Sequence, residues 1–169
     1  KSVDPSLPVY MVHAPLVMDR REFSSSSKRA SYFEQVKAYS RHADVVGFDV
    51  YPVPVPIAKQ ASPASNGAPV GAERVFGEYV AWMRDNFPGK RLLMVLQGFA
   101  YTHLYEESFL MTAVPRSVRE QVPPPSLGQV ETMARQALNG GADTIIWWGQ
   151  GALPTVETAP WPAVSSVSR

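Results

Sequence analysis

Asp49 is the first residue whose type and place suggest chemistry. It lies in the run DVVGFDVYPV, residues 44–53, which is otherwise almost entirely apolar. A carboxyl inside such a run lowers stability unless a partner neutralises it or a function retains it. Asp49 is therefore the candidate catalytic residue, as a proton donor or acceptor. Pairing with an arginine or with a loop amide is the structural alternative.

Gln97 raises a similar question at the end of the run RLLMVLQGFA, residues 91–100. A primary amide can take part in up to four hydrogen bonds when it is buried. It either binds a polar ligand at the end of its strand or is satisfied by the backbone of a neighbouring loop. Phe99 and Tyr101 follow it directly, and Tyr51 follows Asp49. These rings and the amide predict a polar site lined by aromatic side chains.

Four further positions are candidates for ligand contact. Trp147 and Trp148 end the last apolar run, and Gln150 follows between two glycines. Because neighbouring residues of a strand point to opposite faces, one tryptophan ring should face a ligand and the other a helix. Packing of both rings in the core is the structural alternative. His13 closes the first run, where it either contacts a ligand or is a satisfied structural group. The other two histidines lack a metal-ligand spacing with it, and there is no cysteine, so neither a metal nor a cofactor is predicted.

Four nearly continuous apolar runs must position these residues. Continuous runs are typical of strands that are covered on both faces, as in parallel sheets. Each of the first three is followed by a loop and a helical pattern, and brief joints lead from each helix to the next strand. This order predicts right-handed parallel crossovers. The expected strands lie within residues 8–15, 44–53, 91–100 and 143–152.

The three expected helices carry recognisable start or stop signals. The first, residues 31–42, begins with a capping box that joins Ser31 to Glu34. The second, residues 72–90, is stopped by a Pro-Gly pair. The third, residues 126–141, opens with a second capping box and closes on two glycines. The strand-to-helix loops are long, and they leave the carboxyl ends of the strands, where α/β folds build their sites.

The sequence after the fourth strand has the spacing of another helix. Trp161, Val164 and Val167 stand three apart, and Arg169 follows after about two turns. A truncated fourth helix is expected there, with a disordered tail as the alternative. Four parallel strands would leave two open edges. The chain is therefore expected to be a single (β/α)4 unit, residues 1–169, that pairs with another half.

The order of these motifs resembles the carboxyl-terminal half of a glycoside hydrolase (β/α)8 barrel. The resemblance covers nearly the whole chain, through DPSLPVYMVHAP, ADVVGFDVYPVP, GKRLLMVLQGFAY and PSLGQVETMARQALNGGADTIIWWGQGAL. It implies an α/β fold with half of a TIM barrel, about four parallel strands with three helices and a truncated fourth. It also implies hydrolysis of a carbohydrate by two carboxylates. One of the two would lie outside this chain.

Gln97 departs from that pattern, because such barrels often carry a nucleophilic glutamate at the end of the seventh strand. An amide cannot act as a nucleophile or base, so either another carboxylate acts or the amide holds substrate in a divergent or inactive member. The resemblance implies Asp49 as acid or base, with Glu106 and Glu107 as fallback acids. It implies hydrogen bonds or stacking to sugar from the other candidates, which are His13, Tyr51, Gln97, Phe99, Tyr101, Trp147, Trp148 and Gln150.

Composition excludes several partner classes. The net charge is +1, which gives no strong attraction to nucleic acid or to an anionic membrane. No apolar run approaches the roughly 20 residues of a membrane span. The expected partners are a carbohydrate substrate and either an amino-terminal half of the barrel or a second copy of the chain. The alternative function is a non-catalytic carbohydrate-binding or homodimeric half-barrel module. The resemblance favours export, while the sequence itself leaves the compartment open.

Overall fold

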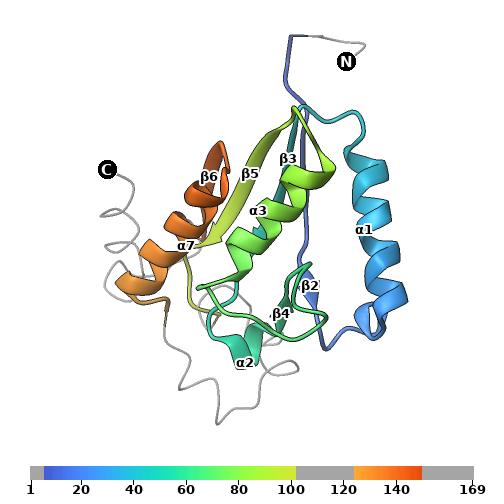
Figure 1. Cartoon of the computed structure of the whole chain (residues 1–169). Helices are drawn as coiled ribbons and strands as arrows, with labels where there is room; N and C mark the ends of the chain where they lie inside the picture. The colour runs from blue at the N-terminus through green and yellow to red at the C-terminus, as the bar shows by residue number, and fades with distance from the viewer. Residues whose placement is uncertain (1–5, 102–123, 150–169) are drawn as a thin grey trace.

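A computed structural model describes residues 6–101 and 124–149, and within them the chain forms an α/β fold around one parallel sheet (Figure 1). The sheet has four strands in the order β1-β3-β5-β6, and every neighbouring pair is parallel. Their bounds are Tyr10–His13 for β1, Val45–Val50 for β3, Arg91–Gln97 for β5 and Thr144–Trp148 for β6. The predicted fold class is confirmed, since each strand lies inside one of the four apolar runs.

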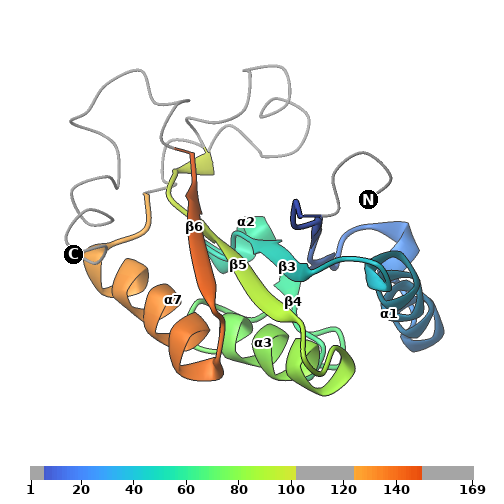
Figure 2. The same cartoon turned by 90° about the horizontal axis from the view of Figure 1, so that it is seen from above.

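The three long helices lie on one side of this sheet, as Figure 2 shows. They are α1 (Ser26–Ser40), α3 (Val75–Asn86) and α7 (Leu127–Gly140). A parallel sheet with helices on one face only is the arrangement expected of half a TIM barrel, in which the other face lines the interior. The fourth helix expected from Trp161 onward lies outside the described residues.

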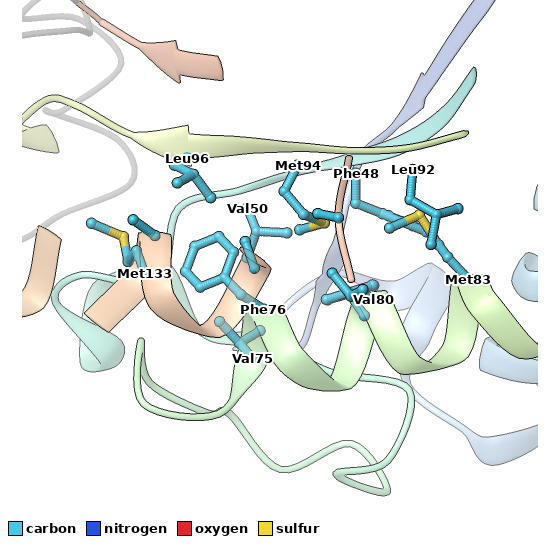
Figure 3. Close-up of a cluster of buried hydrophobic side chains, with 14 of the residues drawn as sticks. Phe48, Val50, Val75, Phe76, Val80, Met83, Leu92, Met94, Leu96 and Met133 are labelled. Atoms are coloured by element: carbon cyan, nitrogen blue, oxygen red, sulfur yellow. The ribbon is translucent and has the colours of Figure 1, made fainter. Parts of the chain in front are cut away.

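The main core fills the space between the sheet and the helices. Alternate residues of β3 and β5 point into it, where they meet the apolar stripe of α3 (Figure 3). The side chains labelled in that view are almost completely buried: Phe48, Val50, Val75, Phe76, Val80, Met83, Leu92, Met94, Leu96 and Met133. Burial of apolar surface on this scale is the dominant favourable contribution to folding.

Helix α1 begins five residues earlier than the sequence predicted. Ser25 is its N-cap, and the Ser25 side chain accepts a hydrogen bond from the backbone of Lys28. The predicted capping box of Ser31 and Glu34 is therefore wrong, because both residues lie inside the helix. The capping box that opens α7 is confirmed: the Ser126 side chain accepts from Gln129, whose own side chain accepts from the Ser126 backbone.

The first two strand-to-helix loops contain structure that the sequence did not predict. Short strands β2 (Leu16–Val17) and β4 (Gln60–Ala61) pair antiparallel, and helix α2 (Val55–Ala58) precedes β4. A 3-10 helix at Arg21–Phe23 precedes α1. The buried Tyr79 hydroxyl joins the two loops, since it donates to the carbonyl of Ala61 and accepts from the backbone of Leu16. The loops are thus fixed to each other and to α3.

Candidate functional site

The face of the sheet opposite the helices carries most of the predicted site. Strand residues alternate between the two faces, so this inner face is formed by the residues that do not enter the main core. It consists of Tyr10, Val12, Val45, Gly47, Asp49, Leu93, Val95, Gln97, Thr144, Ile146 and Trp148. In its centre Val45, Leu93 and Val95 form a small cluster of their own.

Asp49 lies on the inner face near the carboxyl end of β3, beside Val95 of β5. Its Oδ1 atom is buried and has no hydrogen-bond partner among the described residues. Burial raises the pKa of the Asp49 carboxyl from 3.8 to about 6, and a hydrogen bond from its own backbone partly offsets this effect. A carboxyl with such a pKa can both donate and accept a proton near neutral pH.

Gln97 lies on the same face at the end of β5 but is fully buried. Its Nε2 donates to the carbonyls of Val53, at 2.6 Å, and Phe99, at 3.0 Å. Its Oε1 accepts from the backbone of Val53 at 2.9 Å. Both amide hydrogens are therefore used, and the side chain holds the loop that follows β3. This arrangement corresponds to the structural alternative given above for Gln97.

The three predicted aromatic residues come together beside this amide. The Tyr51 and Phe99 ring centroids are 5.0 Å apart with the rings nearly perpendicular, and those of Phe99 and Tyr101 are 5.3 Å apart. Tyr101 also donates its hydroxyl hydrogen to the backbone carbonyl of Tyr51 at 2.7 Å. Phe99 is fully buried, whereas the two tyrosines are partly exposed. The tyrosine rings are thus the parts of this cluster that a ligand could reach.

The tandem tryptophans point to opposite faces, as the strand alternation predicts. Trp148 lies on the inner face next to Gln97 and is 55% exposed. Trp147 packs against the main core on the helix side, and its buried Nε1 has no hydrogen-bond partner among residues 6–101 and 124–149. Trp148 is therefore the one available for stacking. Gln150 lies outside the described residues, as do Glu106 and Glu107.

His13 lies on the helix side of the sheet. Its Nε2 is 2.7 Å from the Ser40 hydroxyl of α1, and its ring is 5.7 Å from that of Phe48 in the main core. Burial lowers the pKa of His13, which favours the neutral ring. The structure therefore brings Asp49, Gln97, Trp148 and the ring cluster to one face and places His13 and Trp147 on the other.

Three residues around Asp49 and Tyr51 were not predicted from the sequence. The buried Gln60 side chain accepts a hydrogen bond from the Tyr51 backbone at 2.7 Å. Tyr32 and Tyr79 lie close enough to Asp49 for its charge to raise the pKa of both phenols, in addition to the larger effect of burial. No local pattern could have identified these residues, because Gln60 lies in the two-residue strand β4 and both tyrosines lie in helices.

Metal binding and membrane spanning find no support in the part of the chain that the structure describes. No cluster of three histidine, aspartate or glutamate side chains there could hold a metal ion. None of the described helices has the length and apolar character needed to cross a bilayer.

Comparison with models of known protein families, with curated proteins and with solved structures finds no match.

Proposed function

We propose that this chain is half of a barrel that hydrolyses a carbohydrate, with Asp49 as an acid or base. The supporting observation is the state of Asp49. Its carboxyl lies on the face that a barrel would enclose, one oxygen is buried without a partner among the described residues, and burial raises its pKa to about 6. An unsatisfied acid of this kind lowers stability, so its presence favours a functional role.

In this proposal the second carboxylate comes from outside the chain. One carboxyl donates its proton to the leaving oxygen as the glycosidic C–O bond breaks. The other accepts a proton from the water whose oxygen forms the new bond to the sugar carbon. Trp148 and Tyr51 supply apolar ring faces for the sugar, and Asp49 carries out one of the two proton transfers. Gln97 acts as a positioning residue that holds the loop bearing Val53.

Asp49→Asn tests the proposal, with Asp85→Asn as a matched control, because Asp85 is an exposed carboxylate on α3. Hydrolysis of a panel of aryl glycosides and soluble polysaccharides is measured with the assembled barrel. We expect Asp49→Asn to lower kcat by roughly 10²–10⁴-fold with little change in sugar binding, and the control to remain active. Equal activity of Asp49→Asn and the parent protein would overturn the role given to Asp49.

A second candidate function is a non-catalytic carbohydrate-binding module. The observation that favours it is the use of both Gln97 amide hydrogens by backbone carbonyls at the position where the resembled family carries a nucleophile. In that case the sugar panel would bind, with quenching of Trp148 fluorescence, and the assembled barrel would hydrolyse none of its members. Binding without turnover therefore separates the two functions.

A further inference from the structure

The inner face of the sheet is covered at its centre and exposed at its edges. Apolar side chains of the two central strands are buried there, whereas those of the two edge strands are exposed. On the inner face, Val45, Leu93 and Val95 of the central strands are at most 8% exposed. The edge strands β1 and β6 contribute four large apolar side chains to the same face, each more than 40% exposed: Tyr10, Val12, Ile146 and Trp148. Neither edge strand has an outer neighbour in the sheet of the described residues. Exposed apolar surface and free strand edges thus coincide.

The two halves of the sheet repeat the same strand–helix–strand unit, and this repeat indicates which strand could pair with each free edge. The Asp44 side chain accepts a hydrogen bond from the backbone of Val9 at 2.7 Å, and the Asp44 backbone donates to the Val9 carbonyl at 2.8 Å. Asp143 makes the same two contacts with Leu92, at 2.7 and 2.9 Å. Each aspartate follows an alanine at the joint between a helix and a strand. The unit β1-α1-β3 is therefore repeated as β5-α7-β6, with Val9 equivalent to Leu92.

This equivalence fixes a register for a further pairing. Tyr10 corresponds to Leu93, and Val45 corresponds to Thr144. Where the first unit meets the second, Gly47 pairs with Leu93 and Asp49 pairs with Val95. If β6 met the β1 of another copy in the same way, Ile146 would pair with Tyr10 and Trp148 with Val12. These are the four exposed apolar residues of the two edges.

The same register gives a closed barrel with the shear of a TIM barrel. Across the sheet, Tyr10 pairs with Val45, which pairs with Arg91 of the second unit. The residue equivalent to Tyr10 in that unit is Leu93, two residues further along the strand. The register therefore shifts by two residues per unit and by eight over four units. A shear of about eight is that of the eight-stranded TIM barrel. Two copies related by a two-fold axis along the barrel contribute those four units.

We propose that two copies of this chain associate through their edge strands, with β6 of each beside β1 of the other, and close a barrel into which both Asp49 carboxyls project. The two copies of β3 then lie four strands apart, on opposite walls. A strand spacing of about 4.8 Å and a tilt of about 36° give a barrel roughly 15 Å across. With each side chain reaching roughly 3 Å inward, the carboxyls lie roughly 8–9 Å apart.

That separation falls in the range of about 6.5–9.5 Å that leaves room for a water between the acid and base of an inverting hydrolase. The second copy thereby supplies the carboxylate that the proposed function places outside the chain. This pairing of the two Asp49 residues rests on the proposed function. The association of the edge strands does not, because it follows from the register and the exposed apolar residues.

Native mass is the first test, with light scattering on the purified chain. We expect twice the 18.6 kDa of one chain. Ile146→Asp buries a charge in the proposed interface and should give a folded monomer by circular dichroism, since Ile146 is 45% exposed in one copy. Leu138→Asp is the control, because Leu138 is similarly exposed on the outer surface of α7 and should leave the mass unchanged. A monomeric parent chain would overturn the proposal.

A cysteine pair tests the register independently. The chain has no cysteine, so Tyr10→Cys with Ile146→Cys introduces only the intended thiols. Within one copy these positions lie three strand spacings apart across the sheet, at least about 14 Å, which no disulfide spans. We expect oxidation to give a covalent dimer, and much less of it from Tyr10→Cys with Thr144→Cys. A dimer that cross-links equally from both pairs contradicts the register.

These results are separable from the proposed function. Asp49→Asn should remain dimeric, because Asp49 lies on a central strand away from both edges. A dimer that hydrolyses no member of the sugar panel would support the association and overturn the enzyme. Hydrolysis by a particle that contains one copy of this chain and a different polypeptide would do the reverse.

Discussion

The two faces of the parallel sheet differ in how completely their apolar side chains are covered, although each face has one buried polar atom without a partner among the described residues. On the helix side, Phe48 and Met94 are fully buried among the helices. On the inner face only the central strands are covered, and Asp49 keeps a buried oxygen without a partner among the described residues. The helix side is therefore built for stability, and the inner face carries the features that a stable monomer would not need.

Two polar residues on the inner face make the contrast sharper. Gln97 and Asp49 both lie near the carboxyl ends of neighbouring strands. The Gln97 amide makes three hydrogen bonds to backbone groups, whereas the Oδ1 atom of Asp49 has no hydrogen-bond partner in the described part of the chain. Gln97 stabilises a loop at this position. The raised pKa of Asp49 predicts that its ionised carboxyl lowers stability, and such carboxyls are candidates for a functional role.

The largest expected effect is the loss of stability in Phe48→Ala on the helix side, compared with Trp148→Ala on the inner face. Phe48 is fully buried and contacts the ring of Tyr79 at a centroid distance of 4.5 Å. Phe48→Ala should lower the free energy of unfolding by about 3–5 kcal/mol, because it leaves a cavity in the main core. Trp148→Ala, at a position 55% exposed in one copy, should cost less than about 1 kcal/mol in a monomeric background such as Ile146→Asp. Urea unfolding of the variants measures both values, and equal losses would contradict the contrast between the faces.

A smaller effect is expected from Gln97→Glu. A carboxylate cannot donate to the carbonyls of Val53 and Phe99, so it would place a negative charge against two buried acceptors. We expect a loss of about 2–4 kcal/mol in unfolding free energy. Gln129→Glu is the control, because an exposed glutamate suits that position of a capping box. A Gln97→Glu protein that is as stable as its parent and gains hydrolase activity would show that the amide replaces a catalytic glutamate.

Local patterns predicted the elements that depend on local rules. The four strands follow from continuous apolar runs, and the α7 capping box follows from a serine three residues before a glutamine. The opposite orientation of the two tryptophans follows from strand alternation. The start of α1 was missed because a run of serines is typical of a loop, yet the Ser25 side chain caps the helix there.

The partners of the site residues depend on contacts that are distant in the sequence. Gln97 bonds to Val53, which is 44 residues away, and β2 pairs with β4 across a whole helix and strand. Neither contact leaves a periodic signal, since both elements of the second pair are two residues long. The sequence could therefore place an amide at the end of β5 and could not decide between ligand contact and a structural role.

The smallest expected effect tests whether Asp49 lowers stability, as its environment predicts. Its pKa is about 6 in the folded chain against an ordinary 3.8. Between about pH 4 and pH 6 the unfolded chain loses this proton first, so the unfolding free energy of the parent protein should fall across that window and then level off. An asparagine amide cannot ionise, and Asp49→Asn should therefore be more stable than the parent above pH 6 by about 1–2 kcal/mol, after allowance for partial solvent screening.

Urea unfolding from pH 4 to pH 7 at one protein concentration measures this difference, because association changes apparent stability with concentration. Asp85→Asn removes an exposed carboxylate from α3 and should follow the parent curve. If the Asp49→Asn curve also followed the parent curve, the Asp49 carboxyl would be as well solvated in the folded chain as in the unfolded one. The contrast between the inner face and the helix side would then rest on the exposed apolar edge residues alone.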